Sequence, residues 1–357
     1  MLDEPAVRDR FDPNGFWRLI ADLPRQARAA RALGRDCPLP EHFTRPRRVV
    51  ILGMGGSAIG GDVVATITEH LGSIPAEVVR DYAAPPVGEG ALLVACSFSG
   101  NTEEVISAFS AQLGGPGMRL ALTTGGALAA IAQEHDVPLI TYDFDGPPRT
   151  ALGYSVLPLL EVLRRLRAVT LDDDAIERAL GGLERCAEAW GPRQPTASNP
   201  AKQIALRLRD RLPYIVGGDV LAVAARRWAG QLAENSKQWA FAGALPEADH
   251  STIVALERQQ EASRTLHAVL LDGPAMDPRN RRRAQLTARE LDSAGVEHEI
   301  VAIEAEDPLV AVLEACQLGD WVSYYVALLH GVDPLPTPIL DRVKAAMAEA
   351  GAGATAS

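Results

Sequence analysis

Short, uninterrupted runs of apolar residues recur along the first part of the chain, and a segment long enough for a helix separates each run from the next. Such runs are typical of strands that are buried on both faces, and their alternation with helices predicts a parallel sheet covered on both sides. We therefore expect an α/β fold of the doubly wound type. The predicted strands are 47–52, 76–80, 91–96, 118–123 and 138–142.

The same design recurs after a stretch rich in helix breakers, residues 190–200. The sequence LPYIVGGD at 212–219 is similar in kind to VVILGMGG at 49–56, and a long helix is expected after each. A chain of 357 residues is also longer than one ordinary core, so two such domains in tandem are expected. The predicted organisation is an N-terminal helical arm (1–45, with helical periodicity over 14–33), a first domain (46–190), a linker (191–200), a second domain (201–348, with strands at 267–271 and 298–303) and a disordered tail (349–357).

Charge and cysteine content exclude several classes of protein. The formal net charge is -11, from 46 acidic and 35 basic side chains, which argues against general binding to nucleic acid or to anionic membranes. An anionic ligand would need a local group of donors. The four cysteines lie far apart without metal-ligand spacing, which indicates buried thiols in a reducing compartment. The start of the sequence has no signal-peptide pattern and no long apolar run is present, so we expect a soluble cytoplasmic protein.

The third predicted strand ends in SFSGNTEE, residues 97–104, and this stretch has two interpretations. Asn101 and Glu104 have the spacing of a capping box, which would only stabilise the start of a helix. Alternatively, unpaired N–H groups at the helix start, together with the hydroxyls of Ser97, Ser99 and Thr102, can hold a phosphate. The eight residues alone leave both interpretations open.

The loop after the first strand, GMGGSA at 53–58, also has more than one interpretation. It fits a dinucleotide fingerprint, and Asp81 lies where a ribose-binding acid would be expected. The additional Gly56 and Ser57, and the second hydroxyl-rich loop on a neighbouring strand, favour one small anion over an extended dinucleotide. A tight strand-to-helix turn would explain the glycines without any ligand.

Three polar residues elsewhere are candidates for catalysis, although each is of a kind that is commonly just solvated. Arg149 follows two prolines on a stiff loop, which suits a cation that stabilises developing negative charge. Glu234 lies about 200° around its predicted helix from Leu232, away from the apolar stripe, so it needs a second surface to become a base. His250 lies in a turn-prone stretch near this carboxylate in the sequence.

Six motifs occur in order between about residues 48 and 345: GMGGSAIGGD, SFSGNTEE, PPRTALG, ENSK, LPEADH and PTPILDRVK. Together they resemble the bifunctional phosphoglucose/phosphomannose isomerases of the phosphoglucose isomerase superfamily, which are built from two sugar isomerase (SIS) domains. The resemblance implies two αβα sandwich domains and an enzyme that needs no cofactor or metal. It also implies interconversion of glucose 6-phosphate and mannose 6-phosphate with fructose 6-phosphate through an enediol, in a homodimer.

The resemblance assigns a role to each candidate residue. Arg149 would stabilise the enediolate and Glu234 would move the proton between C1 and C2. His250 would open the sugar ring in the active site of the neighbouring subunit, and Lys344 would assist at the ring oxygen. Thr337 stands where conventional phosphoglucose isomerases have glutamine and would leave room for both epimers. The residues that would bind the phosphate are Gly56, Ser57, Ser97, Ser99 and Thr102.

These residue types suit an aldose–ketose isomerisation, which needs a carboxylate base, a cation beside the oxyanion, ring-opening groups and a phosphate anchor. Two departures from the family pattern are Ala58, where glycine is usual, and Ser251, where asparagine is common. The second hypothesis is a non-catalytic sugar-phosphate sensor, since SIS domains also serve as binding modules. A sensor would need the phosphate loops without the proton-transfer residues, and no basic helix-turn-helix accompanies them.

Overall fold

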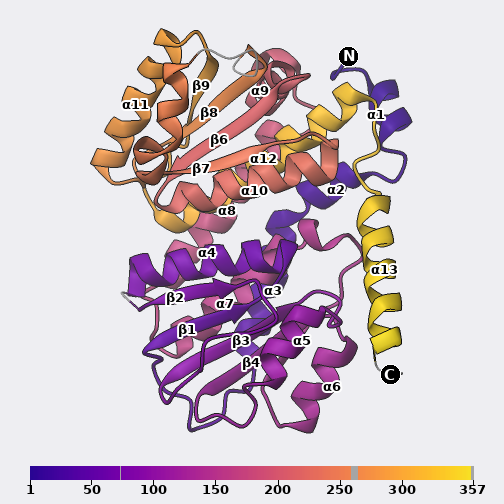
Figure 1. Cartoon of the computed structure of the whole chain (residues 1–357), viewed down its shortest axis with the longest axis vertical. Coiled ribbons are helices and arrows are strands. Elements are labelled where there is room, and N and C mark those ends of the chain that lie inside the picture. The colour runs from indigo at the N-terminus through magenta and orange to yellow at the C-terminus, as the bar shows by residue number, and fades with distance from the viewer. Residues whose placement is uncertain (73, 259–263, 355–357) are drawn as a thin grey trace.

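The chain folds into two parallel β-sheets, each flanked by helices and arranged along the long axis of the molecule (Figure 1). The structure is a computed structural model, and it describes residues 1–72, 74–258 and 264–354. Within these residues the strand order is β2-β1-β3-β4-β5 in the first sheet and β7-β6-β8-β9 in the second. Every strand pairing is parallel, which confirms the predicted α/β fold with two domains of one design.

The first half of the chain forms these elements: α1 Pro5–Phe11, α2 Phe16–Ala21, α3 Leu23–Asp36, β1 Arg48–Leu52, α4 Gly55–Gly72, β2 Ala76–Val79, β3 Ala91–Ser97, α5 Glu103–Ser110, β4 Met118–Thr123, α6 Gly126–Glu134, β5 Leu139–Thr141, the 3-10 helix η1 Pro148–Thr150, α7 Leu152–Arg165 and α8 Asp173–Trp190. The second half forms η2 Thr196–Ser198, α9 Pro200–Leu208, β6 Leu212–Gly218, α10 Val220–Ser236, β7 Phe241–Leu245, η3 Glu247–His250, η4 Thr252–Glu257, β8 Leu266–Asp272, α11 Pro278–Ser293, β9 Glu297–Ala302, α12 Pro308–His330 and α13 Pro338–Ala354.

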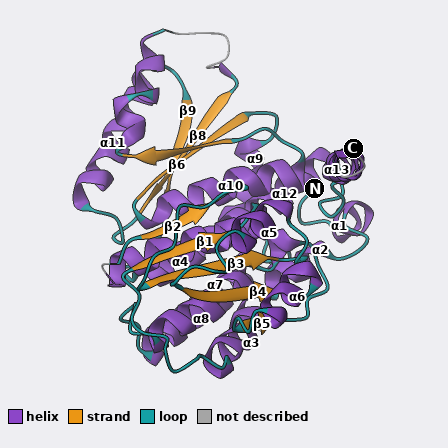
Figure 2. Cartoon of the chain, turned by 60° about the horizontal axis from the view of Figure 1, so that its bottom comes forward, coloured by secondary structure: helices purple, strands orange, loops and turns teal. Residues whose placement is uncertain are grey.

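Strand β1 shows why the first sheet is covered on both sides. Because side chains alternate along a strand, Val50 and Leu52 join one apolar core with residues of α5 and α6. Val49 and Ile51 join the other core, with residues of α4 and α7. Apolar side chains on consecutive residues therefore fill two different cores, as the continuous apolar run predicts. Figure 2 shows the helices on the two faces of this sheet.

The two domains share one core. The larger apolar cluster contains residues of both sheets, and α4 of the first domain packs against α10 of the second.

The segment predicted as a linker, residues 191–200, is held to the rest of the protein by buried polar contacts. Its Asn199 is fully buried, accepts a hydrogen bond from the N–H of Lys202 and donates to the Trp190 carbonyl. Lys202 is buried as well, and its Nζ donates to Asp3 Oδ1 over 2.8 Å.

The predicted N-terminal helix over 14–33 is two helices, α2 and α3, because the chain turns at Asp22 and Pro24 enters the first turn of α3. Helix α3 packs against α7, where Arg31 pairs with the fully buried Glu161 over 2.7 Å. At the other end, the region predicted as a disordered tail begins inside α13, whose last turns are rich in alanine, the residue with the highest helix propensity. Residues 355–357 of that tail lie outside the described residues.

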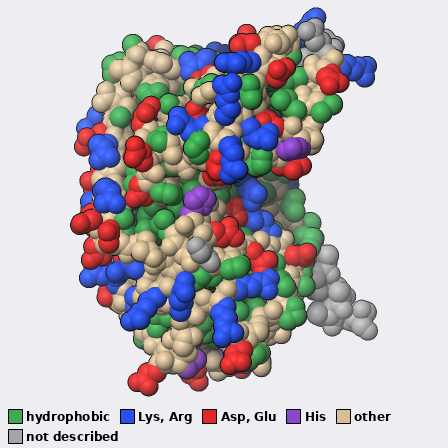
Figure 3. All heavy atoms as spheres, turned by 90° about the vertical axis from the view of Figure 1, so that its left-hand side faces the viewer, with side chains coloured by type: hydrophobic (Ala, Val, Ile, Leu, Met, Phe, Trp, Pro, Cys, Tyr) green, Lys and Arg blue, Asp and Glu red, His purple; other side chains and the backbone are tan. Residues whose placement is uncertain are grey.

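The surface charge and the state of the cysteines can be compared with the predictions made from composition. Acidic and basic side chains are interspersed on the face shown in Figure 3, so this face has no large patch of charge of one sign. All four cysteines are buried and free. Among the helices of the described residues, none combines the length and the apolar character that crossing a bilayer requires.

Candidate active site

The two hydroxyl-rich loops lie side by side at the carboxyl edge of the first sheet. Strands β1 and β3 are parallel neighbours, and Leu52, the last residue of β1, pairs with Ala95, two residues before β3 ends at Ser97, so both loops leave the sheet at the same edge. The first loop continues directly into α4, where Gly56 approaches the η1 turn. A Cβ added at Gly56 would lie 2.8 Å from the Pro148 carbonyl oxygen, so only glycine lets the two segments come this close. Backbone N–H groups at the start of α4 therefore lie beside the turn that carries Arg149.

The second loop is held by its own hydroxyls and by the next loop of the sheet. The hydroxyls of Ser97 and Thr102 are hydrogen-bonded to each other over 2.8 Å. Gly100 has a positive φ of 70°, and a Cβ there would lie 1.8 Å from the Gly125 carbonyl oxygen, so this position requires glycine. Ser97 is buried whereas Ser99 is exposed at the mouth of the loop. The loop is thus a compact turn with one hydroxyl open to solvent.

The capping box predicted for this loop is wrong. Thr102, not Asn101, precedes the first turn of α5, and its side chain makes no capping hydrogen bond. The Asn101 side chain instead accepts from the N–H of Ala127 at the start of α6, 3.0 Å away. Tertiary contact between neighbouring loops therefore replaces the local cap. Among the described residues no side chain caps the start of α5, so its first N–H groups are available to an anion.

Arg149 is buried between the two domains and held by several hydrogen bonds. Its side chain is 5% exposed, and its Cζ lies 5.4 Å from the centre of the Phe16 ring. Nε donates to Asn235 Oδ1 over 2.7 Å, and Nη2 donates to the carbonyl oxygens of Pro334 and Leu335 over 2.7 and 2.8 Å. Burial lowers the pKa of this guanidinium below its usual range, against the raising effect of the nearby Glu234 and Asp333 carboxylates. The cation is thus fixed in an environment of low dielectric.

Glu234 faces Arg149 across the domain boundary. It lies in the last turn of α10 and is 33% exposed, and its Oε2 is 3.6 Å from Arg149 Nη1. On its own helix Glu234 points away from the fully buried Trp228 and Leu232, as predicted, and the first domain supplies the second surface that the carboxylate needed. The structure therefore unites two candidates that are 85 positions apart in the sequence (149 and 234).

His250 lies far from Glu234 in the same chain. It ends η3, just after β7, whose last residue Leu245 pairs with Gly218 at the carboxyl edge of the second sheet. Helix α10 begins at this edge and runs back, so that Glu234 lies at its other end, about 20 Å along the helix axis. His250 is exposed, and among the described residues its ring makes no hydrogen bond or ion pair with the other candidate site residues.

Thr337 and Lys344 differ in how far they are enclosed by the protein. Thr337 is half-buried and its carbonyl oxygen accepts from Leu340 N over 3.0 Å at the start of α13. The preceding Pro334 and Leu335 are the residues whose carbonyls hold Arg149, so Thr337 is anchored close to that guanidinium. Lys344 lies about 10 Å further along α13 and is exposed.

Sequence reasoning missed the buried polar residues that support Arg149. Arg227 of α10 forms a two-pronged pair with Asp320 of α12, at 2.9 and 2.8 Å, and also donates to the Arg149 carbonyl oxygen over 2.8 Å. Asn235, next to Glu234, is fully buried. A signal was present in the sequence, since Asp320 is one of only two acids in the long apolar helix 308–330, the other being Glu314. Such an acid must be paired when it is buried.

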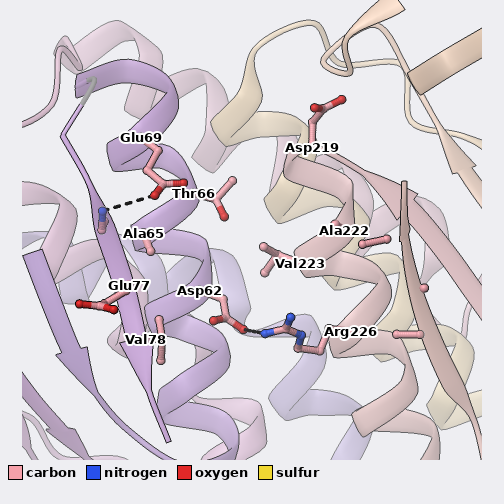
Figure 4. A pocket seen from close by; sticks show the side chains of 14 residues that line it. Asp62, Ala65, Thr66, Glu69, Glu77, Val78, Asp219, Ala222, Val223 and Arg226 are labelled. Atoms are coloured by element: carbon pink, nitrogen blue, oxygen red, sulfur yellow. Dashed lines mark hydrogen bonds and ion pairs between the residues drawn. The ribbon is translucent and has the colours of Figure 1, made fainter. Parts of the chain in front are cut away.

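A cavity of about 340 Å³ opens at the other end of the α4–α10 contact and contains none of the predicted site residues (Figure 4). Asp62 lies within it and pairs with Arg226 across the domain boundary over 3.0 Å and with Arg80 over 2.5 Å. Its lining also carries the carboxylates of Glu69, Glu77 and Asp219. This excess of negative charge disfavours an anionic ligand in the cavity.

Comparison with known proteins agrees with this description. A family model for the SIS domain matches residues 42–143, and one described as the bacterial phospho-glucose isomerase C-terminal SIS domain matches residues 197–347. Among solved structures, the C-terminal domain of glucosamine-fructose-6-phosphate aminotransferase from Francisella tularensis is similar with a TM-score of 0.70 at 16% identity, covering 89% of this chain and 97% of that one. The fold and the loops thus define a protein with two SIS domains.

Whole-chain relatives narrow this class to one family. The bifunctional phosphoglucose/phosphomannose isomerase of Caldicellulosiruptor bescii is 34% identical over 338 residues, which are 94% of this chain and 99% of the relative. The protein of the same name from Aquifex aeolicus is 30% identical over 86% of this chain and 92% of its own length. The chain belongs to the bifunctional phosphoglucose/phosphomannose isomerase family, as its six motifs predict.

Proposed function

We propose that this protein interconverts glucose 6-phosphate and mannose 6-phosphate with fructose 6-phosphate. The observation that carries the proposal is the pairing of Glu234 with Arg149, 3.6 Å apart, in a chain whose two hydroxyl-rich loops lie at the starts of α4 and α5. A base, a fixed cation and an anion site are the groups that an aldose–ketose isomerase needs. A sensor of sugar phosphates would need the loops alone, and a buried guanidinium is costly to keep without a use for its charge.

The reaction follows from the chemistry of these groups. In the open-chain aldose, Glu234 takes the proton from C2 while the electron pair moves to the carbonyl oxygen on C1, giving an enediolate. Arg149 Nη1 stabilises the negative charge on that oxygen. The hydroxyl proton on the C2 oxygen then passes to the oxygen on C1, and Glu234 returns the carbon-bound proton to C1 as the C2–O bond becomes a carbonyl, which yields the ketose. C2 is planar in the intermediate, so rotation about the C2–C3 bond exposes either face of C2 to the same carboxylate. One base can therefore serve both epimers.

The phosphate of the substrate binds in this proposal to Gly56, Ser57, Ser97, Ser99 and Thr102. The N-termini of α4 and α5 converge there, and each contributes the positive end of a helix dipole. This local field matters because the protein as a whole carries a net charge of -11.

The proposed enzyme is a homodimer in which His250 completes the active site of the partner. His250 and Glu234 lie at opposite ends of α10 within one chain, so one subunit alone leaves the ring-opening histidine remote from the base. Large apolar side chains are exposed near the site, as a second copy would require. Trp239 is 77% exposed and stacks on Phe241, which is 48% exposed. Ile339 and Val343, 65% and 57% exposed, lie one turn apart on α13.

Lys344 is placed on the same helix as that exposed apolar face, and we assign it to the ring oxygen of the substrate. If the partner subunit covers α13, the lysine would be removed from solvent and would lie closer to the sugar.

The four buried thiols fit a reducing compartment, so we assign the enzyme to the cytoplasm.

Turnover of the two aldose phosphates is the direct test. Glucose 6-phosphate and, separately, mannose 6-phosphate are incubated with the protein and EDTA, and fructose 6-phosphate is measured. Formation from both is expected. Turnover of one substrate alone would reject the dual specificity and keep the mechanism. Binding of both without turnover would favour the sensor, and nicotinamide binding in a fluorescence titration would favour a dehydrogenase instead.

Removal of the second-loop hydroxyls should weaken substrate binding. The double variant Ser97→Ala/Ser99→Ala is expected to raise KM at least about 10-fold, because hydrogen bonds to a charged phosphate contribute about 1.5–3 kcal/mol each. These contacts form before the reaction and persist through it, so kcat should change less. The control is Ser110→Ala, at the exposed far end of α5. An unchanged KM in steady-state assays would show that this loop does not bind the phosphate of the substrate.

Thr337 sets epimer specificity in the proposed site. Thr337→Gln fills the space beside the sugar, and we expect kcat/KM for mannose 6-phosphate to fall about 10-fold relative to that for glucose 6-phosphate. Thr337→Ser, which keeps the hydroxyl and the space, should retain both activities. Equal losses for the two substrates in the glutamine variant would contradict a role in specificity.

A further inference from the structure

We propose that Asn235 positions Arg149, so that a single edge of the guanidinium remains free for the substrate oxyanion. The inference rests on the proposed role of Arg149 and adds a residue that has no assigned role. Asn235 follows Glu234 in α10, is fully buried and cannot reach solvent. Its contact with Arg149 joins the second domain to the catalytic cation of the first.

The direction of the Asn235 amide is determined by its neighbours. Nδ2 donates to Ser323 Oγ over 2.9 Å, and the Ser323 hydroxyl in turn donates to the Asp320 carbonyl oxygen over 2.9 Å. The serine oxygen is therefore the acceptor, and the amide nitrogen must point to it. This leaves Oδ1 facing Arg149, where it accepts from Nε over 2.7 Å. Asn235 thus presents an acceptor to the guanidinium in one fixed orientation.

The hydrogen bonds of Arg149 show what this orientation achieves. A guanidinium has five N–H donors. Nε is taken by Asn235, and Nη2 by the carbonyls of Pro334 and Leu335. Within the part of the chain that the structure describes, Nη1 has no hydrogen-bond acceptor, since Glu234 Oε2 at 3.6 Å is too far. Nη1 therefore faces the base with both of its donors available.

Losing the Asn235 acceptor would leave Nε without a partner, and the guanidinium would then be held at Nη2 alone, by the carbonyls of Pro334 and Leu335. The backbone keeps its own support, since Arg227 Nη2 donates to the Arg149 carbonyl oxygen over 2.8 Å. The backbone would stay in place while the guanidinium pivoted about Nη2 and displaced Nη1. Misplacement of a catalytic group by about 1 Å can cost about 10²-fold in rate. Asn235 is a positioning residue, since it acts on the substrate through Arg149.

The test is a double-mutant cycle with turnover of glucose 6-phosphate as the readout. Asn235→Ala is expected to lower kcat between about 10- and 100-fold, with KM changed less than about 3-fold. In an Arg149→Ala background the same substitution should cost nothing further, because the group it positions is gone. Asn235→Asp, which is isosteric and keeps an acceptor toward Nε, should retain more activity than Asn235→Ala. An equal loss of kcat from Asn235→Ala in both backgrounds would overturn the inference.

A measurement without turnover separates this inference from the proposed function. The Nε–H of Arg149 is observed by ¹⁵N NMR in the wild-type protein and in the two Asn235 variants. We expect slow hydrogen exchange in the wild type and in Asn235→Asp, and at least about 10-fold faster exchange in Asn235→Ala, where the bond is absent. Equal exchange in all three would refute the positioning role. If the exchange rates differ as expected but Arg149→Ala leaves kcat unchanged, the proposed role of Arg149 fails while the positioning stands.

Discussion

Glu234→Gln is expected to lower isomerisation of both sugar phosphates by about 10³-fold while leaving substrate binding nearly unchanged. The amide keeps the size of the side chain but cannot take a proton from carbon, and a positioned general base contributes about 10²–10⁴-fold to rate. Because Arg149 Nη1 lies 3.6 Å from the carboxylate and makes no hydrogen bond with it, the substitution should leave the guanidinium in place. The phosphate loops belong to the other domain and are untouched.

Two measurements check this expectation. Steady-state turnover gives kcat, and exchange of the substrate C2 hydrogen with deuterated solvent, followed by NMR, reports proton abstraction directly. Glu188→Gln, on the exposed surface of α8, is the control and should behave as the wild type. A Glu234→Gln enzyme that still exchanges the C2 hydrogen at the wild-type rate would show that another group is the base.

The strands could be predicted from the sequence because local composition determines them. The apolar run predicted at 91–96 is strand β3, Ala91–Ser97, and all seven of its residues are buried. Apolar side chains on consecutive residues fit a strand covered on both faces, and that requirement is independent of distant contacts. The helix start predicted at Asn101 was wrong because a distant contact decides it. The Asn101 side chain accepts a hydrogen bond from Ala127, which lies at the start of α6.

The site could be predicted only in part. The six motifs indicate the family, which the comparisons confirm. They also make Arg149 and Glu234 candidates, and the structure brings these two side chains within 3.6 Å of each other. The apolar pattern of α10 shows that Glu234 points away from the core that this helix packs on. It cannot show that Arg149 of the first domain lies opposite, with its Nη1 3.6 Å from Glu234 Oε2. Asn235 was missed because its partners, Arg149 and Ser323, lie 86 and 88 positions away. Long-range hydrogen bonds of this kind leave no periodic signal.

The domain boundary is where the polar groups of this protein are most interdependent. Arg149 belongs to η1 of the first domain, yet the groups that bind it come from α10 and from the segment before α13. A second pair across the boundary, Asp62 with Arg226, joins α4 of the first domain to α10. The apolar core that both domains share holds the paired residues in place. One rigid junction can therefore hold the proposed base, Glu234, close to the Arg149 cation of the other domain.

His250→Ala is expected to lower turnover about 10²-fold when closed-ring glucose 6-phosphate is the substrate, since a positioned acid–base group is lost. His135→Ala, which removes an exposed histidine at the end of α6, is the control. The position of His250 adds a sharper expectation. It lies at the end of α10 opposite to Glu234, so the histidine of each proposed active site must come from the partner. Two inactive variants should then complement each other.

Co-expression of Glu234→Gln and His250→Ala chains tests the shared site. If the chains assort at random into dimers, about half of the dimers are mixed, and each mixed dimer has one site with both an intact glutamate and an intact histidine. Activity should therefore recover to about one quarter of the wild-type value, although each variant alone has about 1% or less. Recovery should vanish when the subunits cannot associate, as in chains that also carry Trp239→Asp and run as monomers in size-exclusion chromatography. Absence of recovery in confirmed mixed dimers would place His250 in the same subunit as the base it serves, or remove it from the reaction.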